Sequence, residues 1–225
     1  MPGFLGTRPG ALAVLVASII AGGLLEWIVT LRERAATTLP SRPGAAAYAR
    51  LALGTLGEVT LTRTSGSAPE DRGTKRLIVG SAASALLLGV LAARRVPSLE
   101  LPGTGWGWFV LGLGLVWAGF GLRIWAIATL GRFFRRIVVV QEEHVVVRTG
   151  PYRLIRHPAY TGNLVMYAGL GLALVNLLSL AVLIVLPVAG HMPRIRVEEA
   201  ELTRGLGEPY RQYAAETSRL VPGVW

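Results

Sequence analysis

The stretch TGNLVMYAGLGLALVNLLSLAVLIVLPVAGHMP, residues 161–193, decides the fold of this chain. It is too long for a single membrane-crossing helix, which needs about 20 apolar residues, and short for two. Asn176 lies in its middle and Pro187 lies near its end. The stretch therefore predicts a helical hairpin with arms at 161–175 and 177–193. We expect the second arm to continue into the polar C-terminal region.

The rest of the chain is also typical of a membrane protein. Of its 225 residues, 52% are hydrophobic and only 16% are charged, whereas about a quarter are charged in a soluble domain. Three more apolar runs, at 11–31, at 77–93 with its flanks and at 106–130, are long enough to span a bilayer. With the hairpin they predict an all-α membrane protein of five transmembrane helices. We expect an N-terminal part, 1–105, and a functional core, 106–225.

The basic residues predict how the chain is oriented. There are 23 Lys and Arg against 13 Asp and Glu, a net charge of +10, and all but Arg8, Arg94 and Arg95 fall on one side of the predicted spans. Basic loops face the cytoplasm, so we expect the N-terminus outside and the C-terminus inside. Because the charge lies between apolar runs, it argues against nucleic-acid binding. The chain has no cysteine and only three scattered histidines, so we expect no metal site.

Between the spans, the sequence predicts a few smaller elements. Residues 45–56 are typical of a short interfacial helix, and residues 137–147 of a small β-hairpin that could cover a site. Glu26 and Arg123 fall at similar depth inside their spans, where they either pair or extend separately to the interface. Gly112, Gly114, Gly119 and Gly121 indicate close helix packing.

A polar segment, GPYRLIRHPAYTG at 150–162, precedes the hairpin. It places two arginines, a histidine and two tyrosines at a membrane boundary, where such groups are costly unless they are used. Pro158 is suited to the first position of the following helix, which aims His157 at the helix N-terminus. The segment therefore predicts a site for a polar, anionic ligand.

A second polar cluster, Arg194, Glu198 and Glu199, follows the hairpin. Since a hairpin returns the chain to the same membrane face, we expect both clusters to meet. Arg194 and Glu198 are four residues apart and share a helix face, whereas Glu199 points elsewhere. The alternatives are that the arginines only anchor the helices at the interface and that the glutamates form a solvated face.

The residue types suggest what this site could bind. Arginine and histidine suit a carboxylate or phosphate, glutamate suits an amine or ribose hydroxyls, and tyrosine rings or Trp125 suit an adenine or a sulfonium. This set favours a zwitterionic nucleoside such as S-adenosylmethionine. It suits a nicotinamide dinucleotide less well, because that ligand needs more phosphate contacts.

These motifs resemble those of a known family. Gly150-Pro151-Tyr152 and the run RHPAYTG at 156–162 resemble the G-x-Y…R-H-P-x-Y-x-G signature of the isoprenylcysteine carboxyl methyltransferase family. The later residues Arg194, Glu198-Glu199, Leu202 and the run 207–213 are similar to that family's C-terminal R…E-E…L…G-x-x-Y…Y pattern. The resemblance covers about residues 106–222, roughly half the chain.

The resemblance implies an integral membrane methyltransferase that binds S-adenosylmethionine, and its product S-adenosylhomocysteine, in a pocket on the cytoplasmic face. By position in the motifs, the expected cofactor-binding residues are Gln141, His144, Gly150, Tyr152, Leu154, Arg156, His157, Tyr160 and Glu199. Arg194 and Glu198 match positions linked to activity, and Arg194 could hold the carboxylate of the acceptor. The implied acceptor is lipophilic, isoprenylcysteine-like, and enters from the bilayer among the membrane lipids.

Other functions stay open on the sequence alone. Membrane phospholipid or amine N-methyltransferases share parts of the motifs, an NADPH-dependent membrane reductase is a further enzyme class, and a non-catalytic scaffold is the alternative outside enzymes. Of the 23 basic residues, 22 are arginine, which favours a high-GC bacterium and hence its cytoplasmic membrane. The physiological acceptor and the oligomeric state do not follow from the sequence.

Overall fold

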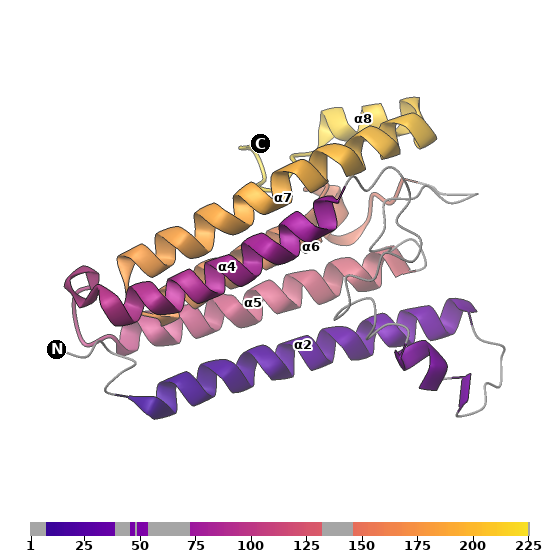
Figure 1. Ribbon diagram of the computed structural model, residues 1–225. Helices are drawn as coiled ribbons and strands as arrows, with labels where there is room; N and C mark the ends of the chain where they lie inside the picture. Colours follow the sequence, from indigo (N-terminus) through magenta and orange to yellow (C-terminus); the bar gives the residue numbers. More distant parts are fainter. Residues whose placement is uncertain (1–7, 39–45, 48, 54–72, 132–145, 225) are drawn as a thin grey trace.

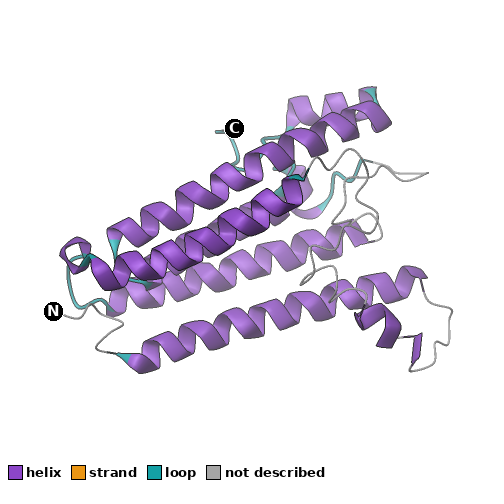
Figure 2. Cartoon of the chain, in the orientation of Figure 1, coloured by secondary structure: helices purple, strands orange, loops and turns teal. Residues whose placement is uncertain are grey.

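The chain forms a bundle of long helices (Figures 1 and 2). The computed structural model describes residues 8–38, 46–47, 49–53, 73–131 and 146–224. Two short 3-10 helices, η2 (Pro97–Leu99) and η4 (Gly150–Arg153), connect longer ones. The long helices in this part of the chain are α2 (Pro9–Thr38), α4 (Thr74–Arg95), α5 (Trp106–Leu130), α6 (Pro158–Ala173), α7 (Leu177–Leu206) and α8 (Glu208–Glu216). The prediction of an all-α membrane protein is confirmed.

The helical hairpin is confirmed and its turn is built around Asn176. The Asn176 side chain accepts a hydrogen bond from the backbone N–H of Ser179 at 3.0 Å, which caps the start of α7. Its amide also donates to the carbonyl of Val96 at 2.9 Å, so the turn is fastened to the end of α4. The second arm continues past Pro187 and Pro193 to Leu206 as one helix. The polar residues after 193 are therefore carried beyond the apolar part of the arm.

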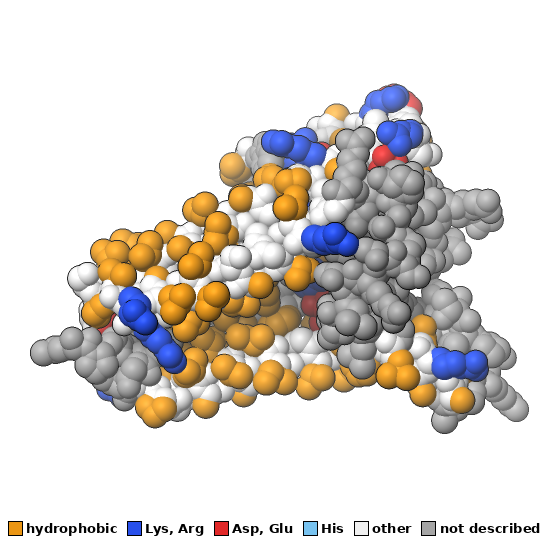
Figure 3. All heavy atoms as spheres, in the orientation of Figure 1, with side chains coloured by type: hydrophobic (Ala, Val, Ile, Leu, Met, Phe, Trp, Pro, Cys, Tyr) orange, Lys and Arg blue, Asp and Glu red, His pale blue; other side chains and the backbone are white. Residues whose placement is uncertain are grey.

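Four of the described helices, α2, α4, α5 and α7, are long and apolar enough to cross a membrane. The chain is thus a multi-pass membrane protein, and Figure 3 shows hydrophobic side chains over the left and central part of one face of the bundle. Helix α6 has 16 residues, or about 24 Å, which is shorter than the roughly 30 Å hydrocarbon core. The fifth crossing therefore stays a prediction.

Helices α5 and α6 pack backbone against backbone. A Cβ atom on Gly112 would lie 2.5 Å from the carbonyl oxygen of Gly169, and one on Gly119 would lie 2.5 Å from that of Gly162. The close packing predicted for Gly112 and Gly119 is confirmed. Among the described residues nothing lies within 4 Å of a Cβ on Gly114 or Gly121, so the prediction is wrong there: those two glycines face away from α6.

Glu26 and Arg123 pair inside the bundle. The Nε atom of Arg123 on α5 lies 2.7 Å from a carboxylate oxygen of Glu26 on α2, and both side chains are mostly buried. Arg123 also donates from Nη1 to the carbonyl of Ala159, at the start of α6, at 3.2 Å. Of the two possibilities for these charges, the structure shows the ion pair. It joins α2, α5 and α6 close to the polar segment 150–162.

The remaining helices complete one bundle. Helix α2 packs on α5, α6 packs on both α5 and α7, and α4 packs on α7 (Figure 1). Since α4 precedes residue 105 and α7 follows it, both parts of the chain contribute to this bundle, and the division at 105 stays a prediction. Residues 46–47 and 49–53 are helical, in agreement with the short helix predicted at 45–56. The β-hairpin predicted at 137–147 falls largely on residues 132–145, outside the described residues.

Candidate functional site

The segment 150–162 is held in a compact turn at the start of α6. Gly150 has a φ of 55°, a conformation that favours glycine, and begins the 3-10 helix η4. Pro158 opens α6 with His157 at the capping position, as predicted. The Tyr152 side chain is buried, and its carbonyl accepts a hydrogen bond from the Tyr213 hydroxyl at 2.8 Å. The segment is thereby fixed against both α6 and α8.

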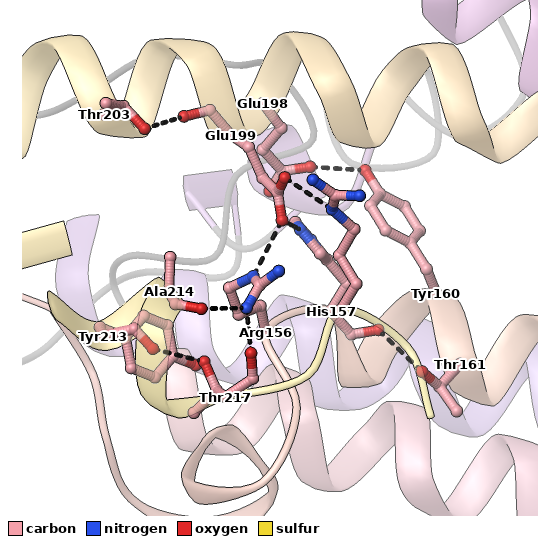
Figure 4. A network of polar contacts seen from close by, with 11 residues as sticks. Arg156, His157, Tyr160, Thr161, Glu198, Glu199, Thr203, Tyr213, Ala214 and Thr217 are labelled. Atoms are coloured by element: carbon pink, nitrogen blue, oxygen red, sulfur yellow. Dashed lines mark hydrogen bonds and ion pairs between the residues drawn. The ribbon is translucent and has the colours of Figure 1, made fainter. Parts of the chain in front are cut away.

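Glu199 lies at the centre of the site (Figure 4). One carboxylate oxygen accepts hydrogen bonds from Nε of Arg156 at 2.9 Å and from Nε2 of His157 at 3.2 Å. The other oxygen accepts from Nε of Arg219 at 2.8 Å. We call these four residues the Glu199 cluster. The two polar clusters on either side of the hairpin do meet, as the sequence predicts.

The electrostatics of the cluster favour an ionised Glu199. Helix α7 is about 45 Å long and therefore exceeds a hydrocarbon core of roughly 30 Å, and its charged residues all follow residue 193, at one end. Burial there opposes ionisation of Glu199, but the hydrogen bonds from His157 and Arg156, with Arg219 in support, outweigh it. Together they lower the Glu199 pKa from 4.5 to about 2. The cluster therefore holds a fixed negative charge among positive groups at neutral pH.

Glu198 faces a different set of side chains, in agreement with the prediction. It accepts a hydrogen bond from the Tyr160 hydroxyl at 2.9 Å. The Tyr160 ring stacks on His157, with centroids 5.7 Å apart, and meets the edge of the buried His191 ring at 5.3 Å. Tyr160 thus connects the Glu199 cluster to the interior of the bundle.

Arg194 lies on the same side of α7 as Glu198. Its side chain is buried and donates a hydrogen bond from Nη1 to the hydroxyl of Thr74, the first residue of α4, at 3.3 Å. It also contacts Tyr160. A buried guanidinium in this place gives the inner part of the site a positive charge next to the carboxylate of Glu198.

Helix α8 covers the outer part of the site. Arg156 donates from Nη1 to the carbonyl of Ala214 at 2.7 Å and to that of Thr217. The Tyr210 hydroxyl is buried and has no hydrogen-bond partner within the described part of the chain. Burial raises the Tyr210 pKa well above its usual range, and the nearby Glu199 and Glu198 raise it further. A buried polar group without a partner is uncommon, so this hydroxyl is available to a ligand.

Most of the predicted site residues come together, and two cannot be placed. Gln141 and His144 lie outside the described residues. Gly150 and Leu154 flank the turn, and more than half of the Leu154 side chain is exposed. Arg156 and His157 bond to Glu199, and Tyr160 bonds to Glu198. Arg194 contacts Tyr160, and Tyr152 lies near Glu198 and Tyr160.

Sequence reasoning missed Arg219 and gave Tyr210 no role. Tyr210 belongs to the C-terminal pattern quoted above, which is a signal that could have found it. Arg219 lies 20 residues after Glu199 in a stretch, ETSRLVPGVW, without a motif that marks it.

These features define a multi-pass helical membrane protein with a buried, charged site where the helical hairpin, the turn before it and α8 meet. The family model of the isoprenylcysteine carboxyl methyltransferase (ICMT) family matches residues 111–204. Protein-S-isoprenylcysteine O-methyltransferase A of Arabidopsis thaliana is 34% identical over 152 residues, which cover 66% of this chain and 77% of the plant protein. The chain belongs to the isoprenylcysteine carboxyl methyltransferase family.

Two further relatives extend this comparison. Protein-S-isoprenylcysteine O-methyltransferase of Saccharomyces cerevisiae is 37% identical over 117 residues, which cover 51% of this chain and 49% of the yeast protein. The solved structure of the eukaryotic intramembrane Ras methyltransferase ICMT superposes with a TM-score of 0.55 at 22% identity, over 79% of this chain and 66% of that one. The structural likeness shows a shared fold, and the chain spans between about half and three quarters of these relatives.

Proposed function

We propose that this chain is an S-adenosylmethionine-dependent methyltransferase that methylates a carboxylate of a lipophilic, isoprenylcysteine-like acceptor. The observation that carries the proposal is the Glu199 cluster, in which the hairpin brings Arg156 and His157 of the first family motif to Glu199 of the second. The relatives are carboxyl methyltransferases by name, and family membership favours this activity over the reductase and the scaffold.

The residues present suit S-adenosylmethionine. The Tyr210 hydroxyl is buried and unpartnered among the described residues, next to a carboxylate pair, and can bond a hydroxyl or amine of the ligand. Glu199 and His157 would hold the cofactor on the α8 side, with Tyr152 and Tyr160 nearby. The aromatic rings there suit a sulfonium, because a cation is attracted to the face of an aromatic ring.

The acceptor would be held on the opposite side of Tyr160. Arg194 is a buried cation that can bond a carboxylate through its planar guanidinium. Helix α7 carries it directly after the apolar arm, so an acceptor with a lipid tail in the bilayer would reach it with its carboxylate. We propose that the acceptor enters sideways from the bilayer and the cofactor enters from the cytoplasm.

The proposed reaction needs no general acid or base. When bound, S-adenosylmethionine would supply an activated methyl group for a carboxylate oxygen, with cleavage of its carbon–sulfur bond to leave a neutral thioether. A carboxylate is already ionised at neutral pH, so no side chain has to remove a proton. Arg194 orients the acceptor, Glu198 holds Tyr160 in place, and the cluster excludes water. Alignment of this kind can contribute several kcal/mol to the rate.

The proposal includes a topology and a location. The charged end of α7, α8 and the segment 150–162 would face the cytoplasm, with the N-terminus outside, in the cytoplasmic membrane of a bacterium. The charge asymmetry of the sequence supports this orientation.

The test is calorimetric binding of S-adenosylhomocysteine to detergent-purified protein, with NADPH as the competing ligand. We expect micromolar binding of S-adenosylhomocysteine, lost in His157→Ala and Glu199→Ala. Glu216→Ala is the matched control, because Glu216 forms an exposed ion pair with Arg148. Binding of NADPH but not S-adenosylhomocysteine by folded protein would overturn the proposal.

The acceptor class needs its own measurement. Purified protein is given methyl-labelled S-adenosylmethionine with an S-prenylated N-acetylcysteine or with phosphatidylethanolamine. A methyl ester releases labelled methanol in mild base, whereas an N-methyl group is stable there. A base-labile product that forms only with the prenylated cysteine supports a carboxylate acceptor. A base-stable label on the amine of phosphatidylethanolamine would overturn that proposal in favour of an amine acceptor.

A further inference from the structure

The segment after α8 begins with Thr217 in an extended backbone conformation and runs back across the candidate site. Ser218 forms a parallel bridge with Ile155. The backbone N–H of Arg156 donates to the carbonyl of Ser218 at 2.8 Å, and the N–H of His157 donates to that of Arg219 at 3.1 Å. In return, the N–H of Ser218 donates to the carbonyl of Leu154 at 3.2 Å. We call residues 217–224 the C-terminal strap.

Side chains also fasten the first four residues of the C-terminal strap. The Arg156 guanidinium donates to the carbonyl of Thr217. The Thr161 hydroxyl donates to the carbonyl of Leu220 at 2.8 Å, and the Leu220 side chain is buried. The strap is therefore attached to the site over its first four residues.

Arg219 joins the strap to the carboxylate at the centre of the site. Its Nε donates to one oxygen of Glu199 at 2.8 Å, while Arg156 and His157 share the other oxygen. Of these three donors Arg219 is the most exposed: 30% of its side chain is accessible, against 10% and 4% for the other two. It therefore lies on the solvent side of Glu199.

These contacts form a closed ring around the carboxylate. The backbone of Arg219 fixes His157 and its side chain fixes Glu199, while His157 and Glu199 are bonded to each other. The last torsion of a glutamate side chain has a broad range, so a carboxylate held by one oxygen can pivot. Bonding of the second oxygen by Arg219 removes that freedom before a ligand arrives, which lowers the cost of binding.

We propose that the C-terminal strap is the outer wall of the cofactor site and that Arg219 is a positioning residue, which orients Glu199 and His157 toward the cofactor. This inference rests on the proposed function. The strap is then a third segment of the site, beside the two family motifs, and the sequence analysis did not predict it.

The first test compares binding of S-adenosylhomocysteine by the wild type, Arg219→Gln and Arg219→Lys. We expect Arg219→Gln to bind at least about 10-fold more weakly, because the second carboxylate oxygen loses its charged donor. Arg219→Lys restores a cation and should bind within about 3-fold of the wild type. Arg211→Gln is the matched control: it removes the same charge from an exposed ion pair on α8 and should leave binding unchanged.

The outcomes separate the two proposals. If the wild type binds and Arg219→Gln binds equally well, the role of Arg219 is refuted while the proposed function stands. If folded wild type does not bind, the proposed function fails and this inference fails with it. Loss of binding in Arg219→Gln and Arg219→Lys alike, with both folded, would also refute positioning by charge.

A second test needs no variant, so it holds even if Arg219→Gln does not fold. Hydrogen exchange of the wild type is followed with and without S-adenosylhomocysteine. The N–H groups of Ser218 and His157 form the hydrogen bonds between the strap and residues 154–157. If the strap is the outer wall of the site, these two groups should exchange about 10-fold more slowly in the complex. Unchanged exchange over 217–220 in a protein that binds the ligand would refute the strap as a wall. The N–H of Leu99, at the far end of the bundle, is the internal control.

Discussion

Replacement of Glu26 by glutamine should destabilise the protein, because it removes one partner of the buried ion pair between α2 and α5. Glu26→Gln keeps the size of the side chain and removes its charge. The Arg123 guanidinium would keep its bond to the carbonyl of Ala159 but lose its counter-charge, 2.7 Å away. Both groups are at least 85% buried, since their side chains are 13% and 15% exposed, so water cannot replace the lost partner.

The size of the effect follows from this geometry. Two unit charges about 4 Å apart attract by about 4 kcal/mol at an effective dielectric constant near 20. Removal of one partner from a buried ion pair typically costs about 3–5 kcal/mol, because it leaves the other charge uncompensated. Glutamine still accepts a hydrogen bond, so we expect a loss of about 3 kcal/mol in the free energy of unfolding.

The assay is reversible unfolding in mixed micelles of increasing SDS content, followed by helical circular dichroism. Glu216→Gln removes a carboxylate from an exposed ion pair with Arg148 and should change the unfolding free energy by less than about 0.5 kcal/mol. The double variant Glu26→Gln with Arg123→Gln removes both charges and should lose less than the sum of the two single variants. If Glu26→Gln matches Glu216→Gln, the reasoning about the buried pair is wrong.

Two further predictions use the same unfolding measurement. The pKa of Glu199 is lowered from 4.5 to about 2, so its ionised form stabilises the fold. This stabilisation, about 3 kcal/mol, is fully present above pH 4.5 and is lost as the pH falls through about 2. Glu199→Gln should show a smaller loss over this range, and identical acid profiles would contradict the assignment. Gly112→Ala should destabilise by about 1–3 kcal/mol, because its Cβ would lie 2.5 Å from the Gly169 carbonyl oxygen. Gly114→Ala, with nothing within 4 Å among the described residues, should be neutral or stabilising, and equal effects at both positions would refute the packing argument.

The sequence predicted the fold well where one local signal decides the structure. The limits of α5 matched the apolar run 106–130, and Asn176 marked the turn of the hairpin because a polar cap is needed where one buried helix ends and another begins. The meeting of the two polar clusters followed from the hairpin alone. Helix faces were harder to predict: of four glycines on α5, only Gly112 and Gly119 face α6.

Long-range contacts at the site could not be predicted. Arg219 reaches Glu199 only because the chain turns back after α8 and pairs with the segment at 154–157. No periodicity or spacing in the sequence encodes that return. In the same way, the sequence placed Glu26 and Arg123 at one depth but could not choose between a pair and two separate interfacial charges, since that depends on how α2 turns toward α5.

The close contact between α5 and α6 explains why the family signature ends in a glycine, Gly162 in this chain. The backbone of Gly162, the last residue of RHPAYTG, contacts the backbone of Gly119. The second contact joins Gly112 to Gly169, and it lies seven residues from the first on each helix. Seven residues are about two helical turns, so both contacts lie on one stripe. One inserted residue would rotate that stripe by about 100° and shift it by about 1.5 Å. The final glycine of the motif therefore fixes the distance from the α5–α6 contact to His157, and so the position of the polar site along the bundle.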